Sequence, residues 1–129
     1  MARVHVIDED EAERATVGAA LRKRGHEVME SSAAPADLES LGDSDLVVAD
    51  IRARNLDGLD VIRRLCGERR ERPIVLALAG RQGRVGARTV LDLAKGLGAD
   101  ATVAKPVSGE QLANVVARLL TKGVAGHAD

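Results

Sequence analysis

The stretch Leu46-Val47-Val48-Ala49-Asp50 decides the fold, because a run of four apolar residues ends abruptly in an acidic one. A short, continuously apolar run is typical of a strand that is buried on both faces of a sheet. The chain contains four further runs that predict strands, at Val4 to Ile7, His26 to Glu30, Ile74 to Ala79 and Ala101 to Ala104.

Helical patterns separate these runs. Apolar stripes and end signals predict five helices, from about Glu11 to Arg24, from Pro35 to near Gly42, from Leu59 to Cys66, from about Thr89 to Leu97, and a last one that contains Leu112 to Leu120. Strict alternation of strand and helix predicts an α/β protein with a doubly wound five-stranded parallel sheet and helices on both faces. Ligands of such sheets bind beyond the carboxyl ends of the strands.

Size and composition indicate one globular domain, which we expect to span residues 1–122, followed by a short C-terminal tail at 123–129. The net charge of −1 argues against binding nucleic acid or an anionic membrane, and the absence of Phe, Trp and Tyr removes any stacking platform for bases. No signal peptide or membrane-spanning run is evident, so a cytoplasmic location is expected. Cys66 lies on an apolar helical stripe, where a small core residue is expected.

Charged residues follow three of the predicted strands. Asp8 and Glu9 follow the first, Asp50 the third and Lys105 the fifth. Taken singly, Asp8 and Asp10 are explained as helix caps, Asp50 as a turn residue and Lys105 as a surface charge. Together they converge on one edge of the sheet, where clustered carboxylates are costly without a cation. Carboxylates beside a lysine are typical of Mg²⁺ sites that also bind phosphate.

The order and spacing of several motifs resemble the receiver domain of two-component response regulators over nearly the whole chain. The matching pieces are Val6-Ile7-Asp8-Glu9, Leu46 to Asp50, Asp57-Gly58-Leu59, Pro73 before the fourth strand, and Gly98-Ala99-Asp100-Ala101 leading to Lys105-Pro106. The resemblance implies a (βα)5 flavodoxin-like fold that takes part in a phosphorelay.

The same resemblance implies roles for individual residues. Glu9 and Asp50 would coordinate Mg²⁺ directly, Asp8 would act through water, and the backbone carbonyl of Arg52 would be a further ligand. Asp50 would accept phosphate from the phosphohistidine of a histidine kinase or phosphotransfer protein, with Lys105 neutralising the phosphoryl oxygens. The Lys105-Pro106 peptide bond would be cis. Self-phosphorylation and dephosphorylation would be the only chemistry, so the chain is not expected to be an enzyme. Output would come from docking a downstream protein, and the fifth strand with the last two helices offers a homodimer contact.

Two residues depart from the family pattern. Receivers usually carry Ser or Thr at the end of the fourth strand, where this chain has Leu78 or, with the register shifted by one, Ala79. An aromatic residue is usual on the fifth strand, where Thr102 stands three residues before Lys105. Both residues that normally couple phosphate to a surface change are therefore absent.

Four arginines lie near the predicted site in the sequence, and each could contact the acidic pocket or a phosphoryl group bound there. Arg52 and Arg54 follow Asp50, and they either point into solvent or fold over the acidic pocket, where a guanidinium could replace Mg²⁺ in part or grip a phosphoryl group. Arg81 and Arg84 lie in a glycine-rich loop after the fourth strand and could approach a phosphorylated Asp50.

Three functions are weighed. The favoured one is a phosphoacceptor receiver, either stand-alone or a fragment of a larger protein, since the length leaves no room for an output domain. The alternative is a pseudo-receiver that docks partners without phosphorylation. The retained Asp8, Glu9, Asp50 and Lys105 argue against it. A flavodoxin-like cofactor binder ranks third, because the chain lacks a phosphate loop after the first strand and any aromatic ring.

Overall fold

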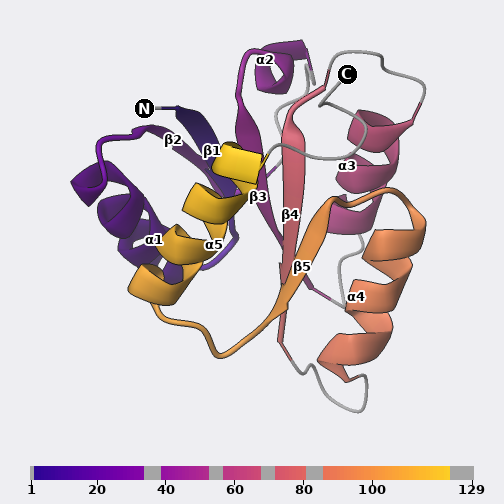
Figure 1. Cartoon of the computed structure of the whole chain (residues 1–129). Coiled ribbons are helices and arrows are strands. Elements are labelled where there is room, and N and C mark those ends of the chain that lie inside the picture. Colours follow the sequence, from indigo (N-terminus) through magenta and orange to yellow (C-terminus); the bar gives the residue numbers. More distant parts are fainter. Residues whose placement is uncertain (1, 34–38, 53–56, 68–71, 81–85, 123–129) are drawn as a thin grey trace.

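The computed structural model describes residues 2–33, 39–52, 57–67, 72–80 and 86–122. Strands and helices alternate along this part of the chain (Figure 1). The strands are β1 (Arg3–Ile7), β2 (Glu27–Ser31), β3 (Leu46–Ile51), β4 (Ile74–Ala79) and β5 (Ala101–Ala104). The helices are α1 (Glu11–Lys23), α2 (Glu39–Gly42), α3 (Asp57–Cys66), α4 (Ala87–Gly96) and α5 (Gly109–Lys122).

All five strands form one parallel sheet in the order β2-β1-β3-β4-β5. The order reverses direction at β1, which pairs with β2 on one side and with β3 on the other. The register places Ile7 beside Ala49, Asp50 beside Leu78 and Ala79 beside Ala104, so the carboxyl ends of β1, β3, β4 and β5 meet at one edge. This is the switch point at which open parallel sheets bind their ligands.

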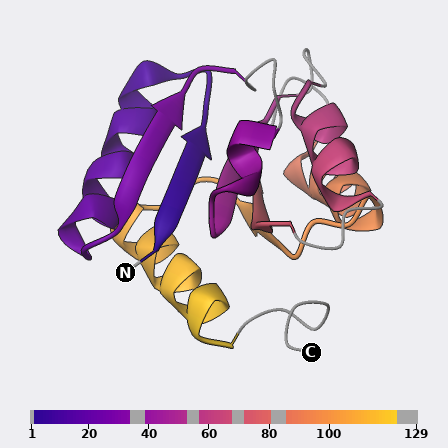
Figure 2. The ribbon, with the colours of Figure 1, turned by 90° about the horizontal axis from the view of Figure 1, so that it is seen from above.

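Helices cover both faces of the sheet, with α1 and α5 on one side and α3 and α4 on the other (Figure 2). Alternate residues of β3 and β4 point to the two sides: Val47 and Val75 pack with α3 and α4, whereas Val48 and Leu76 pack with α1 and α5. Double coverage explains why β3 and β4 are apolar throughout rather than alternating.

The predicted fold is therefore confirmed, with small differences at the ends of elements. β3 does not stop before Asp50 but continues through it to Ile51, which places the Asp50 side chain inside the sheet edge rather than on a turn. Pro35, the predicted start of the second helix, lies outside the described residues, and α2 is described only over Glu39–Gly42. Gly25 ends the first helix with a positive φ of 90°, as glycine permits.

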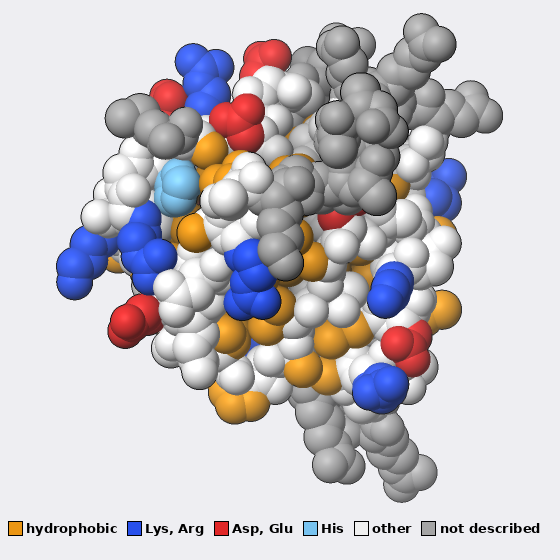
Figure 3. Space-filling view, in the orientation of Figure 1, with side chains coloured by type: hydrophobic (Ala, Val, Ile, Leu, Met, Phe, Trp, Pro, Cys, Tyr) orange, Lys and Arg blue, Asp and Glu red, His pale blue; other side chains and the backbone are white. Residues whose placement is uncertain are grey.

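Charged side chains of both signs are scattered over the face seen in Figure 3 and do not gather into one field. This distribution agrees with the net charge of −1. Among the described residues, no helix has the length and apolar character needed to cross a membrane. Cys66 is half-buried and packs against the core cluster on the α3 and α4 side.

Candidate phosphoacceptor site

Asp50 lies at the centre of the charged cluster, near the end of β3. Its side chain is only 2% exposed. Lys105 Nζ lies 2.6 Å from Asp50 Oδ1, and Arg52 Nε lies 3.3 Å from Asp50 Oδ2. Both contacts are ion pairs without hydrogen-bond geometry, so within the described residues neither carboxylate oxygen of Asp50 accepts a hydrogen bond. Buried oxygens in this condition are rare in folded proteins and are typical of sites that react with or bind a further group.

The electrostatics of Asp50 follow from its burial. Desolvation raises the pKa of Asp50 from 3.8 to about 6, and the negative charge of Asp8 acts in the same direction, while Lys105 and Arg52 oppose the rise. Burial alone would lower the pKa of Lys105, but its contacts with Asp50 and Glu13 outweigh that effect and raise it. The resident cations thus offset only part of the cost of a buried carboxylate.

Asp8 comes directly after β1 and turns into the same pocket. It is a buried residue, and its Oδ1 accepts hydrogen bonds from Arg52 Nη2 at 3.1 Å and from the Asp10 N–H at 2.9 Å. Asp10 caps α1, because its Oδ1 accepts from the Glu13 N–H. Asp8 and Asp10 could both cap this helix, but only Asp10 does so. The Asp8 carboxylate therefore lies in the pocket instead.

Glu9 and Glu13 lie at the rim of the pocket. Glu9 Oε2 is 3.9 Å from Arg52 Nε, and its side chain is about two-fifths exposed. Glu13, in the first turn of α1, accepts a hydrogen bond from Lys105 Nζ at 2.6 Å and lies 3.7 Å from Arg52 Nη2. The carboxylate oxygens of Asp8, Glu13 and Asp50 lie within 4.8 Å of one another.

Glu13 was not predicted as a site residue. It stands three residues after Asp10, the spacing of a capping box, in which a glutamate normally reaches back to the N–H of the capping residue. Here the Asp10 N–H is already bonded to Asp8, so the Glu13 carboxylate is free to contact Lys105. The signal that could have located Glu13 is this spacing, read together with an acid two residues before the capping residue.

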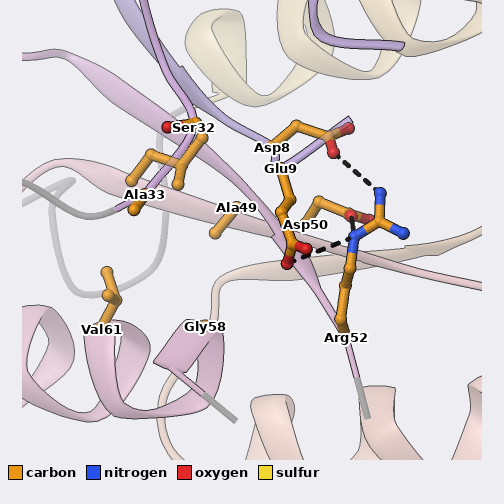
Figure 4. Close-up of a pocket in the computed structure, with 10 residues that line it drawn as sticks. Asp8, Glu9, Ser32, Ala33, Ala49, Asp50, Arg52, Gly58 and Val61 are labelled. Carbon is orange, nitrogen blue, oxygen red and sulfur yellow. Dashed lines mark hydrogen bonds and ion pairs between the residues drawn. The ribbon is translucent and has the colours of Figure 1, made fainter. Parts of the chain in front are cut away.

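A backbone hydrogen bond holds Lys105 at the edge of the sheet. The Lys105 N–H donates to the Ala79 carbonyl at 2.9 Å, and the Lys105-Pro106 peptide bond is cis, as predicted. Gly58, in the first turn of α3, lies so close to β3 that a Cβ at this position would be 3.2 Å from the Asp50 carbonyl oxygen. Figure 4 shows Arg52 extending past Asp50 toward Asp8, with Gly58 on the α3 ribbon to the left of Arg52.

The residues present fit a hard divalent cation. Four carboxylates each lie within 4 Å of Arg52, of Lys105 or of both: Asp8, Glu9, Glu13 and Asp50. Together these six charged groups carry a formal net charge of −2. All the side-chain donors are carboxylate oxygens, which Mg²⁺ prefers, and the Asp50 oxygens lack hydrogen-bond donors among the described residues. A cavity of about 50 Å³, with Asp8, Glu9 and Asp50 in its lining, is large enough for a small ion and water.

The end of β4 carries no hydroxyl group toward this pocket. Leu78 lies beside Asp50 in the register and Ala79 beside Ile51, and both are buried apolar residues. Thr102 is the second residue of β5 and lies beside Ala77. The side chains of Arg54, Arg81 and Arg84 lie outside the described residues, so the hypotheses about them stay predictions.

Comparison with known proteins identifies the family. A model of the response regulator receiver domain matches residues 4–117. The chain belongs to the response regulator receiver domain family.

Individual relatives agree with this assignment. The receiver domain is 30% identical over 122 residues to the transcriptional regulatory protein AfsQ1 of Streptomyces coelicolor, covering 92% of this chain and 51% of that protein. The chain thus spans about half the length of this curated relative. The BeF3-activated receiver domain of DrrB is 25% identical with a TM-score of 0.75, and the coverage is 94% and 98% of the two chains. A CheY-like receiver from Methanospirillum hungatei JF-1, 20% identical, shares the fold with a TM-score of 0.77 over 95% of each chain.

The acidic cluster matches the phosphoacceptor pocket of receiver domains. Asp8, Asp50 and Lys105 lie together as the resemblance implied, Glu9 lies at the rim, and Glu13 is an addition. A phosphorylation-independent docking module is not favoured, since such a role gives no reason to bury an acceptor carboxylate in a negatively charged pocket.

Proposed function

We propose that this receiver domain takes a phosphoryl group onto Asp50 from a histidine kinase or phosphotransfer protein and then binds a downstream protein partner. The observation that carries the proposal is the buried Asp50 carboxylate, whose two oxygens accept no hydrogen bond from the described residues. Its Oδ1 lies 2.6 Å from Lys105 Nζ, and its Oδ2 lies 3.3 Å from Arg52 Nε. The functional domain would span residues 1–122 and would act in the cytoplasm. It would also be able to form a homodimer.

The chemistry needs little more than positioning and charge. An Asp50 carboxylate oxygen attacks the phosphorus of the donor phosphohistidine, a P–O bond forms, and the P–N bond breaks as the imidazole leaves with the electron pair. Lys105 stabilises the negative charge on the transferred oxygens. The same acceptor would react slowly with a small phosphodonor and lose the phosphoryl group to water, so the domain remains a signalling module rather than an enzyme.

The proposed metal ligands are Asp50, Asp8, Glu9 and the Arg52 carbonyl, and Glu13 adds a carboxylate that the family resemblance did not imply. Bound Mg²⁺ would supply charge neutralisation for the phosphoryl oxygens. Among the chain's own residues, Asp8 and Glu13 hold Arg52 and Lys105 at the pocket through hydrogen bonds of 3.1 and 2.6 Å. They thereby orient both cationic side chains toward Asp50.

Phosphorylation with acetyl phosphate tests the proposal directly. The wild-type domain, incubated with Mg²⁺ and acetyl phosphate, should gain the mass of one phosphoryl group, and Asp50→Asn should gain none. Asp60→Asn is a matched control, because Asp60 is an exposed acid of α3 that pairs with Arg63 outside the pocket. An unmodified wild-type protein at saturating Mg²⁺, or modification that persists in Asp50→Asn, would contradict the acceptor assignment.

A further inference from the structure

The guanidinium of Arg52 lies inside the acidic pocket rather than in solvent, with its side chain 24% exposed. It lies within 4 Å of four carboxylates: Nη2 is 3.1 Å from Asp8 Oδ1 and 3.7 Å from Glu13 Oε2, and Nε is 3.3 Å from Asp50 Oδ2 and 3.9 Å from Glu9 Oε2. Figure 4 shows the head group beside Asp8, Glu9 and Asp50, with dashed lines marking its contacts.

The contacts of Arg52 are incomplete. Nη2 donates to Asp8, but the buried Nε has no hydrogen-bond acceptor among the described residues, although it lies 3.3 Å from an Asp50 oxygen that likewise lacks a donor. A well-formed arginine–carboxylate pair has two parallel hydrogen bonds, and this pair has none. By contrast, Arg72 makes bonds of 2.7 and 2.8 Å to the two oxygens of Asp100 elsewhere in the same chain. Charge therefore holds Arg52 in the pocket more than hydrogen-bond geometry does.

A divalent cation needs the carboxylate oxygens that the guanidinium now approaches. Asp8 and Asp50 are the two most buried acids of the cluster, with side chains 4% and 2% exposed, and both are among the nearest partners of Arg52. Two cations held a few ångströms apart repel each other strongly in a partly desolvated site. The flexible arginine side chain can leave the pocket while its backbone stays at the end of β3.

We propose that Arg52 is the resident cation of the pocket and that a divalent cation binds by displacing its guanidinium from Asp8 and Asp50. The inference rests on the proposed function, because it concerns the cation site of the same pocket. Arg52 then sets the concentration of Mg²⁺ at which Asp50 becomes competent to accept a phosphoryl group. In the metal-free protein the arginine stabilises the fold. When Mg²⁺ is present, its guanidinium competes with the ion for the carboxylates of Asp8 and Asp50.

Removing the competitor has two opposite effects. Arg52→Gln should tighten Mg²⁺ binding on the order of tenfold to a hundredfold, because it removes one unit charge a few ångströms from the ion and the cost of displacing it. The same change should lower the thermal stability of the metal-free protein, since it leaves the buried acids less compensated. If the role of Arg52 were purely structural, Arg52→Gln would lower the thermal stability without raising the affinity for Mg²⁺.

The experiment measures Mg²⁺ binding by calorimetry and metal-free unfolding by circular dichroism in the full chain. Arg52→Lys, which keeps the charge but not the planar fork, should give an affinity between those of wild type and Arg52→Gln. Arg63→Gln is the charge-matched control, because Arg63 pairs with exposed Asp60 outside the pocket and should leave Mg²⁺ affinity unchanged.

The outcomes separate the inference from the proposed function. Tighter Mg²⁺ binding by Arg52→Gln than by wild type supports the inference. This holds also if the wild-type protein binds Mg²⁺ too weakly to measure while Arg52→Gln binds it measurably. Equal affinities of wild type and both Arg52 variants would overturn it while leaving a Mg²⁺-dependent acceptor intact. Absence of Mg²⁺ binding in all variants would overturn both the inference and the metal-dependent part of the proposed function. Should Arg52→Gln not fold, the Arg52→Lys affinity decides alone.

Discussion

Replacing Asp50 by asparagine should make the metal-free receiver domain more stable at neutral pH, although the change removes the proposed phosphoacceptor. The Asp50 side chain is 2% exposed, and its burial raises the pKa from 3.8 to about 6 despite the nearby Lys105 and Arg52. Asparagine has nearly the same shape and carries no charge to desolvate. The neutral side chain therefore avoids the cost that the carboxylate imposes on the folded state.

The sign and the size of the effect follow from proton linkage. Between pH 3.8 and about 6 the folded state retains a proton on Asp50 that the unfolded chain has released, so the free energy of unfolding falls as the pH rises. The loss is complete above the folded-state pKa. A pKa displaced from 3.8 to about 6 corresponds to about 3 kcal/mol at pH 7. Asp50→Asn should escape this loss.

Urea unfolding followed by far-ultraviolet circular dichroism measures the effect, since the chain has no aromatic residue for fluorescence. With a chelator present, the stability difference between Asp50→Asn and wild type should grow by about 2 kcal/mol from pH 4 to pH 7, because a small part of the loss has already occurred at pH 4. Asp60→Asn removes an exposed carboxylate of α3 and should follow wild type throughout. Parallel stability profiles of wild type and Asp50→Asn would refute the reasoning, because they would mean that Asp50 is ionised without cost.

Two further predictions concern the framework around the pocket. Gly58→Ala places a Cβ 3.2 Å from the Asp50 carbonyl oxygen and should lower the free energy of unfolding by about 1–3 kcal/mol in urea titrations, whereas Gly96→Ala meets no atom within 4 Å and should not destabilise. Arg72→Ala leaves the buried Asp100 carboxylate without its cationic partner, with only the Val75 N–H among the described residues still donating to it, and should cost about 3–5 kcal/mol in the same assay. Calorimetry should show unchanged Mg²⁺ affinity in Arg72→Ala; a weakened affinity would mean that the ion pair supports the pocket as well as the fold.

Much of the fold could be predicted because its signals are local. The apolar run before Asp50 is continuous since β3 is covered on both faces, and Gly25 stops α1 with a backbone conformation that favours glycine. Parallel strands then bring Asp8, Asp50 and Lys105 to one edge without any knowledge of side-chain packing.

The parts of the site that could not be predicted depend on side-chain directions. Whether Arg52 points to solvent or to Asp8 is decided by a partner 44 positions away in the sequence, and nothing in the local sequence specifies it. Glu13 has the spacing of a capping residue, and only the bond from the Asp10 N–H to Asp8 frees it for Lys105. For Arg52 and for Glu13 alike, the direction of the side chain depends on which of several possible partners the charged group contacts.

The apolar end of β4 has a consequence for how a partner would recognise a phosphorylated form of this domain. With Leu78 and Ala79 beside the acceptor strand, no hydroxyl at that position can follow the phosphoryl group and carry a rearrangement toward α4. Among the described residues, what phosphorylation would then change at the surface is the local electric field around Glu9 and Glu13. At physiological ionic strength that field decays over about 8 Å. A protein that distinguishes the two forms by this field must therefore contact the rim itself, and its preference should weaken as salt is added.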